Sequence, residues 1–261
     1  MLFRSVFKHD QYGIQVESGG YCSWDDCTIK NNRGSGIHVS KGDVMVRSCS
    51  ITKNADNGII ADRRSRVLVK GGAITKNGAN GILLRKRGRV VMEQNTISEN
   101  GMTGVLVTKG GRLEADNNRI LDGRHAGIVI EKGLVDLFCA HIAGNAGPGM
   151  VVGRRARANL SGCVIDKSAV SPVLVHEGGR LRAKDTTWQA NNVPSIECRD
   201  RGRIRLHHCY IQDNDASGLL IGPKGTVILT GSLITRNNGD GMIIRKSGRA
   251  AAWKSFINGN D

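Results

Sequence analysis

The sequence predicts an all-β fold, a single-stranded right-handed parallel β-helix (solenoid) of about 11 coils of 22–23 residues. Three observations predict it. A small residue recurs at this spacing from end to end, short runs of β-branched and aliphatic residues follow it, and an asparagine closes most copies. A fixed period of this length indicates a repeat architecture. No copy holds the 3.6-residue periodicity of a helical repeat or the LxxLxL frame of a leucine-rich repeat.

Each repeat begins with a small head residue and a short strand. Apolar triplets such as 82–84 and 105–107 follow the heads, and short runs of this kind bounded by Gly, Asn and Asp are typical of strands. The heads are Gly13, Gly36, Gly58, Gly81, Gly104, Gly127, Gly149, Pro172, Ser195, Gly218 and Gly241. A basic or Gly-rich turn comes next, and it is one residue shorter in the coils that begin at Gly36 and Gly127.

A second and a third strand complete the coil. An alternating run such as 90–92 follows the turn, and an apolar column comes after it: Ile29, Ile51, Ile74, Ile97, Ile120, Ile142, Ile165, Trp188, Ile211, Ile234 and Ile257. Three residues later stand Asn32, Asn54, Asn77, Asn100, Asn145, Asn191, Asn214, Asn237 and Asn260, with Gly123 and Ser168 as the exceptions. Three strands a coil, each paired with its copy ~4.8 Å away, make a parallel β-helix.

The asparagine column predicts a ladder. Asn tolerates the left-handed backbone that a tight turn between sheets requires. Identical side chains stacked one coil apart can hydrogen-bond to one another, as they do in cross-β stacks. The usual chirality of parallel crossovers predicts the right hand.

We expect one domain over residues 1–261, because no linker or change of period divides the repeats. The first coil lacks its opening strands and neither end has a capping helix, so we expect a solenoid truncated or uncapped at both ends. Missing segments would cap these ends, or chains would associate end to end. No apolar run reaches the roughly 18 residues of a membrane span.

The seven cysteines favour a reducing compartment. Cys27, Cys49, Cys163 and Cys209 share a column that holds small residues elsewhere, which predicts buried, reduced thiols. An odd count without paired spacings and an N-terminus without a secretory signal indicate an intracellular, cytoplasmic location. No Cys or His cluster has zinc spacing, so we expect neither a metal nor a cofactor.

A basic double column is the first candidate surface. Five residues after the heads stand Lys41, Arg63, Lys86, Lys109, Lys132, Arg154 and Lys246, and eight residues after them stand Arg66, Arg89, Arg112, Arg157, Arg180, Arg203 and Arg249. Stacked like charges repel, and the net charge is +15, so we expect an acidic partner. A solvated turn kept soluble by its charge is the alternative. Polysaccharide is favoured over nucleic acid because no aromatic recurs beside these columns as a stacking platform.

An apolar stripe is the second candidate surface. The middle residue of the first strand points outward, since its neighbours must face the core. It is aliphatic in Ile60, Leu83, Leu106, Val129, Val151 and Leu174, and also in Leu220 and Ile243. An exposed apolar file of this length favours a protein interface, and coverage by missing segments of the chain is the alternative.

The third candidate lies where the repeat loosens, between residues 168 and 200. His176, Glu177, Glu197, Arg199 and Asp200 come from two adjacent coils, and Glu177 and Asp200 replace the Lys or Arg of the basic column. Carboxylates beside a His and an Arg are the groups of acid–base chemistry. The residues favour the simpler interpretation, which is mixed salt links among exposed turn residues.

The GIxVxxGG…CxIxxN repeats resemble those of the pectate-lyase-like superfamily of right-handed parallel β-helices, most closely the carbohydrate-binding and sugar-hydrolase type. The stretch NRILDGRHAGIVI, residues 118–130, is similar to β-helix repeats of F-box ubiquitin-ligase receptors, where the helix implies a substrate-recognition module. Pectate lyases would imply a cluster of calcium-binding Asp, and polygalacturonases and alginate epimerases would imply motifs that this sequence lacks.

Two functions therefore compete. The first is a non-catalytic recognition or scaffold module that binds a protein through the stripe or an acidic polymer through the basic columns. The second is a carbohydrate-active enzyme, a lyase, epimerase or hydrolase, acting on an acidic polysaccharide through the irregular cluster. The residues favour the first function.

Overall fold

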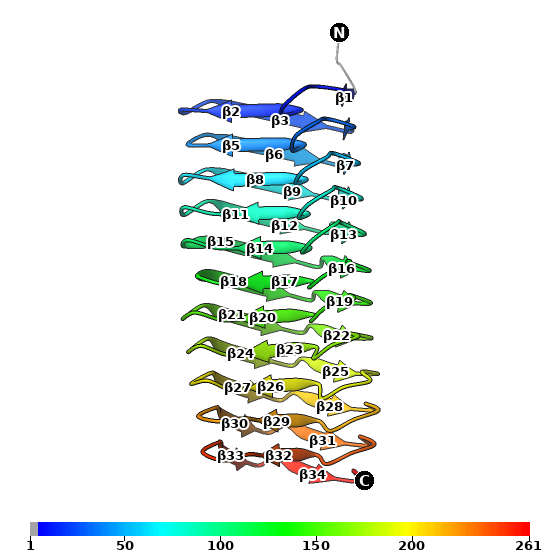
Figure 1. The fold of residues 1–261 in the computed structure, drawn as a ribbon, viewed down its shortest axis with the longest axis vertical. Coiled ribbons are helices and arrows are strands. Elements are labelled where there is room, and N and C mark those ends of the chain that lie inside the picture. Colours follow the sequence, from blue (N-terminus) through cyan, green and yellow to red (C-terminus); the bar gives the residue numbers. More distant parts are fainter. Residues whose placement is uncertain (1–4) are drawn as a thin grey trace.

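The computed structural model describes residues 5–261 as a column of stacked coils built from three parallel sheets, and it contains no helix among those residues (Figure 1). Each coil contributes one strand to each sheet in turn. We number the sheets in the order in which the chain enters them after each head residue. This is the predicted all-β solenoid of about 11 coils.

Sheet 1 has 11 strands and follows the heads. They are β2 (Ile14–Glu17), β5 (Ile37–Ser40), β8 (Ile59–Asp62), β11 (Ile82–Leu84), β14 (Val105–Val107), β17 (Ile128–Ile130), β20 (Met150–Val152), β23 (Val173–Val175), β26 (Ile196–Cys198), β29 (Leu219–Ile221) and β32 (Met242–Ile244).

Sheet 2 has 11 strands and follows the basic turn. They are β3 (Tyr21–Asp25), β6 (Asp43–Arg47), β9 (Arg66–Lys70), β12 (Arg89–Glu93), β15 (Gly111–Asp116), β18 (Gly133–Phe138), β21 (Arg157–Ser161), β24 (Arg180–Lys184), β27 (Arg203–His207), β30 (Thr226–Thr230) and β33 (Arg249–Trp253).

Sheet 3 has 12 strands and carries the isoleucine column. They are β1 (Ser5–Phe7), β4 (Thr28–Lys30), β7 (Ser50–Thr52), β10 (Ala73–Thr75), β13 (Thr96–Ser98), β16 (Arg119–Leu121), β19 (His141–Ala143), β22 (Val164–Asp166), β25 (Thr187–Gln189), β28 (Tyr210–Gln212), β31 (Leu233–Thr235) and β34 (Phe256–Asn258).

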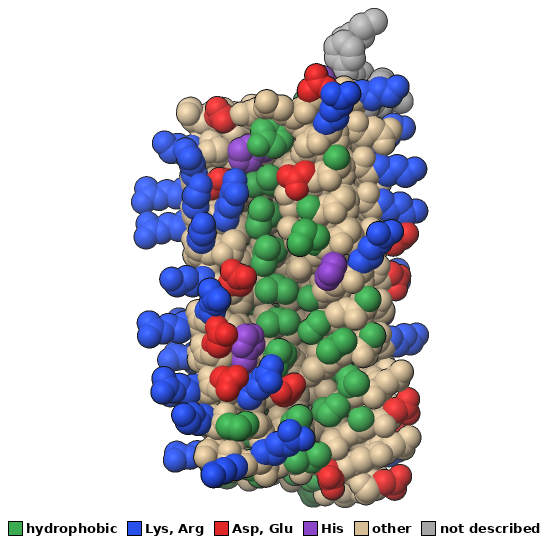
Figure 2. Space-filling model, viewed as in Figure 1, with side chains coloured by type: hydrophobic (Ala, Val, Ile, Leu, Met, Phe, Trp, Pro, Cys, Tyr) green, Lys and Arg blue, Asp and Glu red, His purple; other side chains and the backbone are tan. Residues whose placement is uncertain are grey.

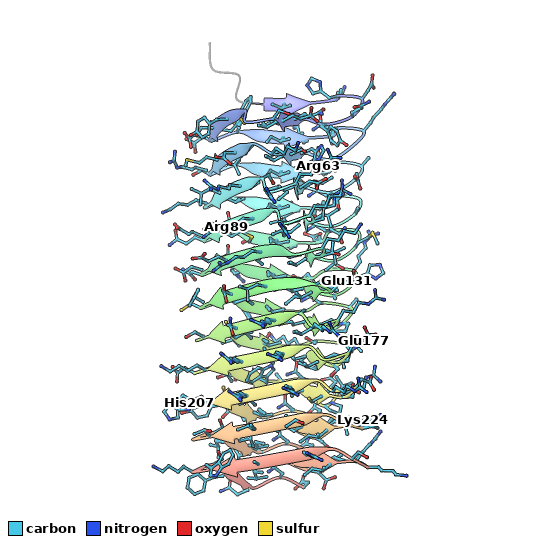
Figure 3. All side chains as sticks on the ribbon, turned by 90° about the vertical axis from the view of Figure 1, so that its left-hand side faces the viewer. Arg63, Arg89, Glu131, Glu177, His207 and Lys224 are labelled. Carbon is cyan, nitrogen blue, oxygen red and sulfur yellow. The ribbon has the colours of Figure 1, made fainter. Side chains whose placement is uncertain are left out.

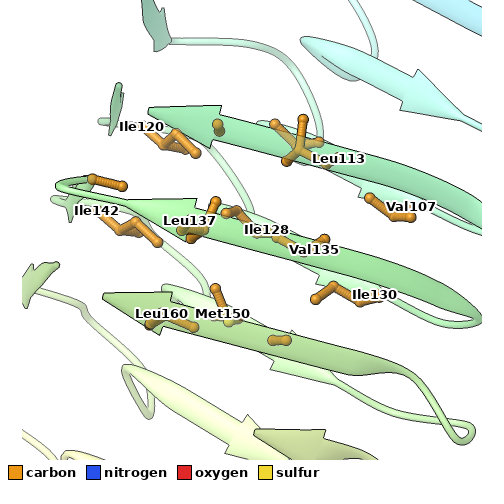
Figure 4. Packing of buried hydrophobic residues seen from close by; sticks show 14 of the residues in the cluster. Val107, Leu113, Ile120, Ile128, Ile130, Val135, Leu137, Ile142, Met150 and Leu160 are labelled. Carbon is orange, nitrogen blue, oxygen red and sulfur yellow. The ribbon is translucent and has the colours of Figure 1, made fainter. Parts of the chain in front are cut away.

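The register stacks equivalent residues directly on one another. Ile82 pairs with Ile59 and Val105, for example, so alternation along a strand becomes a column along the solenoid. The inward columns form one continuous apolar core, part of which Figure 4 shows. The head column is small for a steric reason: a Cβ added to Gly81 would lie 2.6 Å from the carbonyl oxygen of Gly104 in the next coil.

The predicted asparagine ladder is present. Asn54 Nδ2 donates to Asn77 Oδ1 at 2.9 Å, and Asn77 Nδ2 donates to Asn100 Oδ1 at 3.0 Å. The same oxygens accept from backbone N–H groups, as Asn77 Oδ1 does from Asn54 N at 3.2 Å. Gly123 replaces an asparagine of the ladder and has no side-chain amide to donate. Its backbone N–H still donates to Asn145 Oδ1 at 3.1 Å. The ladder therefore provides hydrogen-bond partners for buried peptide groups that the sheets leave without one.

The cysteine column is also a hydrogen-bonding column, which the sequence reading did not foresee. Its members accept a bond from the backbone N–H one coil earlier, whether through sulfur, as Cys49 Sγ does from Cys27 N at 3.4 Å, or through the amide of Asn95 or the hydroxyl of Ser232. Burial raises the pKa of the Cys49, Cys163, Cys198 and Cys209 thiols to about 11. Within residues 5–261 the seven cysteines form no disulfide bond.

Candidate functional site: a basic edge

The turn between sheets 1 and 2 has an uncommon backbone. In the third coil Arg63 and Arg64 both have positive φ, 51° and 66°, and Ser65 N closes the turn onto Asp62 O at 3.1 Å. Two successive residues of positive φ define the type I′ turn, which Gly, Asn and Asp favour. Similar closing bonds join Gly88 to Arg85 and other pairs down the solenoid.

Lysine and arginine occupy these left-handed positions repeatedly. They are Lys41, Arg63, Arg64, Lys86, Arg87, Lys109, Arg154, Arg155, Arg201 and Lys224. Each such residue costs about 1 kcal/mol or more relative to glycine. At the corner between sheets 2 and 3 the left-handed residue is more often Asp, Asn, Ser, Gln or Gly, as in Asp26, Asn117 and Gly162. The turns between sheets 3 and 1 also hold single left-handed cations, such as Lys53 and Lys76. The first turn differs because it holds two in succession, at 63–64, 86–87 and 154–155, and its own backbone does not require this charge.

The second basic column begins the strands of sheet 2 and lies beside these turns. Arg66, Arg89 and Arg112 pair in register, and Arg157, Arg180 and Arg203 form a second run. All are exposed on the outer face. We call the left-handed turn cations together with Lys132 and these arginines the basic edge. Figure 3 faces it, with Arg63, Glu131, Glu177 and Lys224 along the line of turns and His207 at the far end of sheet 2.

Two hollows interrupt the basic edge, and each adjoins a turn that is one residue short. The first, of about 430 Å³, is lined by Lys41, Arg63, Arg64 and Lys86 alone. The second, of about 490 Å³, lies around the short turn at Lys132 and also takes in Lys109, Arg154 and Arg155, with Glu131 and Glu177. Both are places where an anionic group would meet several cations at once.

A buried carboxylate lies close to the first hollow. The side chain of Asp62 is 4 % exposed, and its Oδ2 accepts from Arg85 Nε at 3.1 Å and lies 3.7 Å from Lys86 Nζ. Its Oδ1, the Ser65 hydroxyl and both ring nitrogens of His38 are buried without a hydrogen-bond partner in the described part of the chain. Burial lowers the pKa of His38. Asp62 thus anchors cations of the edge, and nothing in the repeat pattern had distinguished it.

The apolar stripe lies on the outer face of sheet 1, as its spacing predicts, and runs down the middle of the face in Figure 2 beside the lysines and arginines. Leu83, Leu106, Val129 and Leu174 are half-buried. Ile60 differs: it is 5 % exposed, so it offers almost no surface to a partner. The rest of the stripe as a protein-binding surface stays a prediction.

The irregular cluster is a set of ion pairs. Arg154 Nε lies 3.3 Å from Glu177, and Arg199 Nε lies 3.4 Å from Glu197 and 3.7 Å from Asp200. His176 Nδ1 is 3.7 Å from Glu177. Each carboxylate thus has an arginine partner, which is the arrangement of salt links among turn residues. Across residues 5–261 no group of three or more His, Cys, Asp or Glu side chains is placed to hold a metal ion.

The middle residue of each strand of sheet 2 also points outward, and this column was not identified from the sequence. It changes character down the solenoid, from apolar at Met45, Leu68 and Val91, to acidic at Glu114 and Asp136, to basic at Arg182 and Arg205. The apolar part floors a pocket of about 340 Å³ between Tyr21, Arg66 and Arg89. The acidic part neutralises its neighbours, since Arg89 contacts Glu114 at 3.0 Å and Arg112 contacts Asp136 at 3.5 Å.

The architecture matches a known family across nearly the whole chain. A family model described as a right handed beta helix region matches residues 2–134 and 113–260. The chain belongs to the right-handed β-helix family. The predicted hand and the resemblance to the pectate-lyase-like superfamily are confirmed. A search of the curated proteins found no significant match.

Solved structures share the fold at low sequence identity. The pectate lyase Pel9A is 10 % identical, with a TM-score of 0.63 over 85 % of this chain and 70 % of that one. The periplasmic alginate epimerase AlgG is 12 % identical, with a TM-score of 0.67 over 94 % and 76 %. The A-module of the Azotobacter vinelandii mannuronan C-5 epimerase AlgE6 is 14 % identical, with a TM-score of 0.60 over 92 % and 88 %. These similar structures are carbohydrate-active enzymes, and they lend no support to a non-catalytic scaffold.

The predicted intracellular location is wrong. A protein that shares the fold over most of this chain is periplasmic. The prediction rested on the cysteines and on an N-terminus without a secretory signal. The cysteine column holds small residues that fit the corner, Gly72 and Ala140 among them, and some members, such as Cys49 and Ser232, also accept a backbone hydrogen bond. These thiols report on packing and not on the compartment. No helix among the described residues is long and apolar enough to cross a membrane.

Proposed function

We propose that this protein binds an acidic polysaccharide, with the polymer lying along the solenoid axis across the basic edge. The observation that carries the proposal is the concentration of charge on the basic edge, where two successive cations recur on one turn, at 63–64, 86–87 and 154–155, and cations line two hollows. Like charges gathered in this way repel one another, which indicates an anionic partner outside the fold. Two similar structures, those of a pectate lyase and an alginate epimerase, agree with a polymer of this class.

The length of the edge favours a polymer over a small anion. From Lys41 to Arg157 it spans six coils, which is roughly 25 Å at the interstrand spacing. The first hollow spans the coils of Lys41, Arg63 and Lys86, and the second begins in the next coil at Lys109 and reaches Glu177, so the two follow one another along the edge. A ligand that neutralises all of these cations must carry repeated negative charge in one direction.

The edge lacks the features that favour single-stranded nucleic acid. Aromatic platforms on which bases stack are the usual partner of a basic groove. No Phe, Tyr or Trp lines either hollow. Tyr21 is exposed beside Arg66 and Arg89 at one end of the basic edge, and a single ring does not make a row of stacking platforms. The exposed Phe138, Tyr210, Trp253 and Phe256 belong to strands of sheets 2 and 3. Sugar acids need no such platform.

Catalysis is the second candidate, and the irregular cluster favours it. The cluster adjoins the second hollow, because Glu177 belongs to both. In such an enzyme His176 and Glu177 would exchange protons with the sugar, and Arg199 would bind its carboxylate near Glu197 and Asp200.

Affinity for alginate, pectate and uncharged dextran, measured over a salt series, tests the binding proposal. We expect both acidic polymers to bind, dextran not to bind, and the affinity for alginate to fall by roughly tenfold or more between 50 and 200 mM salt. Equal binding of dextran, or affinity that is independent of salt, would contradict the proposal. The same incubations, followed for unsaturated or shortened products and repeated with Glu177→Gln, decide whether the cluster is catalytic.

A further inference from the structure

We propose that a second group of cations, on the open face of sheet 2, binds a polysaccharide segment that carries clustered sulfate groups. It consists of five cations, Arg180, Arg182 and Lys184 on β24 with Arg203 and Arg205 on β27, and of His207 beside them, and we call it the cation grid. Arg180 and Arg203 also belong to the basic edge, whereas the other four residues lie beyond it. The inference rests on the proposed function and names a narrower class of ligand, one with more than one anionic group per sugar.

The grid follows from alternation and register. In β24 and β27 every second residue is buried, and the residues between them are exposed on the outer face. The strands are neighbours in parallel register, so Arg180 pairs with Arg203, Arg182 with Arg205, and Lys184 with His207. The six side chains therefore form three rows of two, ~4.8 Å apart across the strands and roughly 7 Å apart along them.

The arginines of the grid are uncompensated, in contrast to Arg89 and Arg112 on the same sheet. No ion pair joins Arg180, Arg182, Arg203 or Arg205 to a carboxylate in the described part of the chain, whereas Arg89 and Arg112 each contact an acid. Within the grid only Lys184 has such a neighbour, Asp185 at 3.6 Å. Like charges paired directly across strands destabilise a sheet. The fold gains nothing from this arrangement, which indicates an anion outside the fold.

The middle row of the grid has neutral neighbours and an open hollow in front of it. In register with the middle row, Asn159 stands on one side and Ile228 on the other. Asn159 Nδ2 donates to Asp136 Oδ1 at 2.7 Å and so lies between that acid and the grid. A hollow of about 430 Å³ lies against Asn159, Arg182, Lys184, Arg205 and His207.

The close spacing of the cations determines how many anionic groups the ligand must carry per sugar. Four guanidinium groups and an ammonium group lie within two strands, and each guanidinium can hold one planar or tetrahedral oxyanion through paired N–H donors. A polyuronate offers one carboxylate per sugar, which is too few anions for an area of ~5 by 14 Å. A sulfated sugar carries additional oxyanions on the same ring. The grid therefore fits a sulfated polysaccharide better than a purely carboxylated one.

Heparin, its fully desulfated form and alginate are the probes, and Arg182→Ala/Arg205→Ala is the variant. We expect the wild-type protein to bind heparin at least tenfold more tightly than desulfated heparin. The double variant should lose at least tenfold in affinity for heparin and stay within about twofold for alginate, which the basic edge holds. Lys53→Ala/Lys167→Ala is the matched control, because both lysines are exposed, unpaired and on the opposite turns. It should leave all three affinities nearly unchanged.

Each other outcome overturns the inference in a recognisable way. If the double variant still prefers heparin over desulfated heparin as strongly as the wild type does, the grid is not the sulfate site. The proposal for the basic edge would then be unaffected. Failure of the wild-type protein to bind alginate and heparin alike contradicts the proposed function itself. Tighter binding of inorganic polyphosphate than of heparin, lost in the double variant, replaces sulfate with phosphate. Arg182→Lys/Arg205→Lys keeps the charge and should recover only part of the affinity, because lysine lacks the paired donors.

Discussion

Replacing Arg63, Lys86, Lys109 and Arg154 with glycine should reduce affinity for alginate by roughly a hundredfold while leaving the protein as stable as before or more stable. The loss follows from removing four cations of the basic edge, which should also lower the slope of log affinity against log salt by about 3. The stability follows from the backbone, because all four positions have positive φ, which glycine adopts without strain. Calorimetric titration gives the affinity and urea unfolding gives the stability.

The opposite turns provide a control of equal charge and equal backbone geometry. Lys53, Lys76, Lys167 and Arg236 also have positive φ, and they lie between sheets 3 and 1. Their replacement with glycine changes the net charge by the same amount, so an effect of overall charge would appear in both variants. We expect this control to keep affinity within about threefold. Equal losses in the two variants would contradict a role for the basic edge as a site.

The second large effect concerns the asparagine ladder. Asn77→Ala removes bonds that Oδ1 accepts from Asn54 N and Asn54 Nδ2, and bonds that Nδ2 donates to Ile51 O at 3.1 Å and to Asn100 Oδ1. The residue is 1 % exposed, so the groups left behind cannot reach water. Each buried group without a partner costs about 1–3 kcal/mol. We expect the free energy of unfolding in urea to fall by about 3–5 kcal/mol.

Asn260→Ala is the comparison for the ladder. Asn260 receives bonds from Asn237 but lies in the last coil, where its own amide is bonded to Asn258 O and Ile234 O and is partly open to water. Solvent can replace these partners, so the loss should be about 1 kcal/mol. A cost for Asn77→Ala no greater than that for Asn260→Ala would show that the ladder does not hold the coils together.

What the sequence predicted well is what repeats in nearly every coil. Gly81, Ile97 and Asn100 are dictated by the contact between one coil and the next, so their columns reveal the sheets, the ladder and the outward face. Asp62, Arg182 and Arg205 occur in one or two coils only, and a reading by columns treats such residues as exceptions. Their importance lies in what stands beside them in neighbouring coils, which becomes visible only when the register is known.

Burial within one column also depends on neighbours that differ between coils. Ile60 and Leu83 hold equivalent positions on sheet 1, yet Ile60 is buried and Leu83 is half exposed. His38, not an aliphatic residue, pairs with Ile60 on the preceding coil. Column position fixes the direction of a side chain, whereas the side chains around it fix its exposure.

Chemical acetylation of lysines, with and without bound alginate, tests the central claim most directly. Lys41, Lys86, Lys109 and Lys132 are exposed on the basic edge, and Lys53, Lys76 and Lys167 are exposed on the opposite turns, so one digest reports both sides of the same molecule. We expect alginate to slow acetylation of the first group severalfold and to leave the second group unchanged. Equal protection of both groups, or protection of the second alone, would contradict binding along the basic edge.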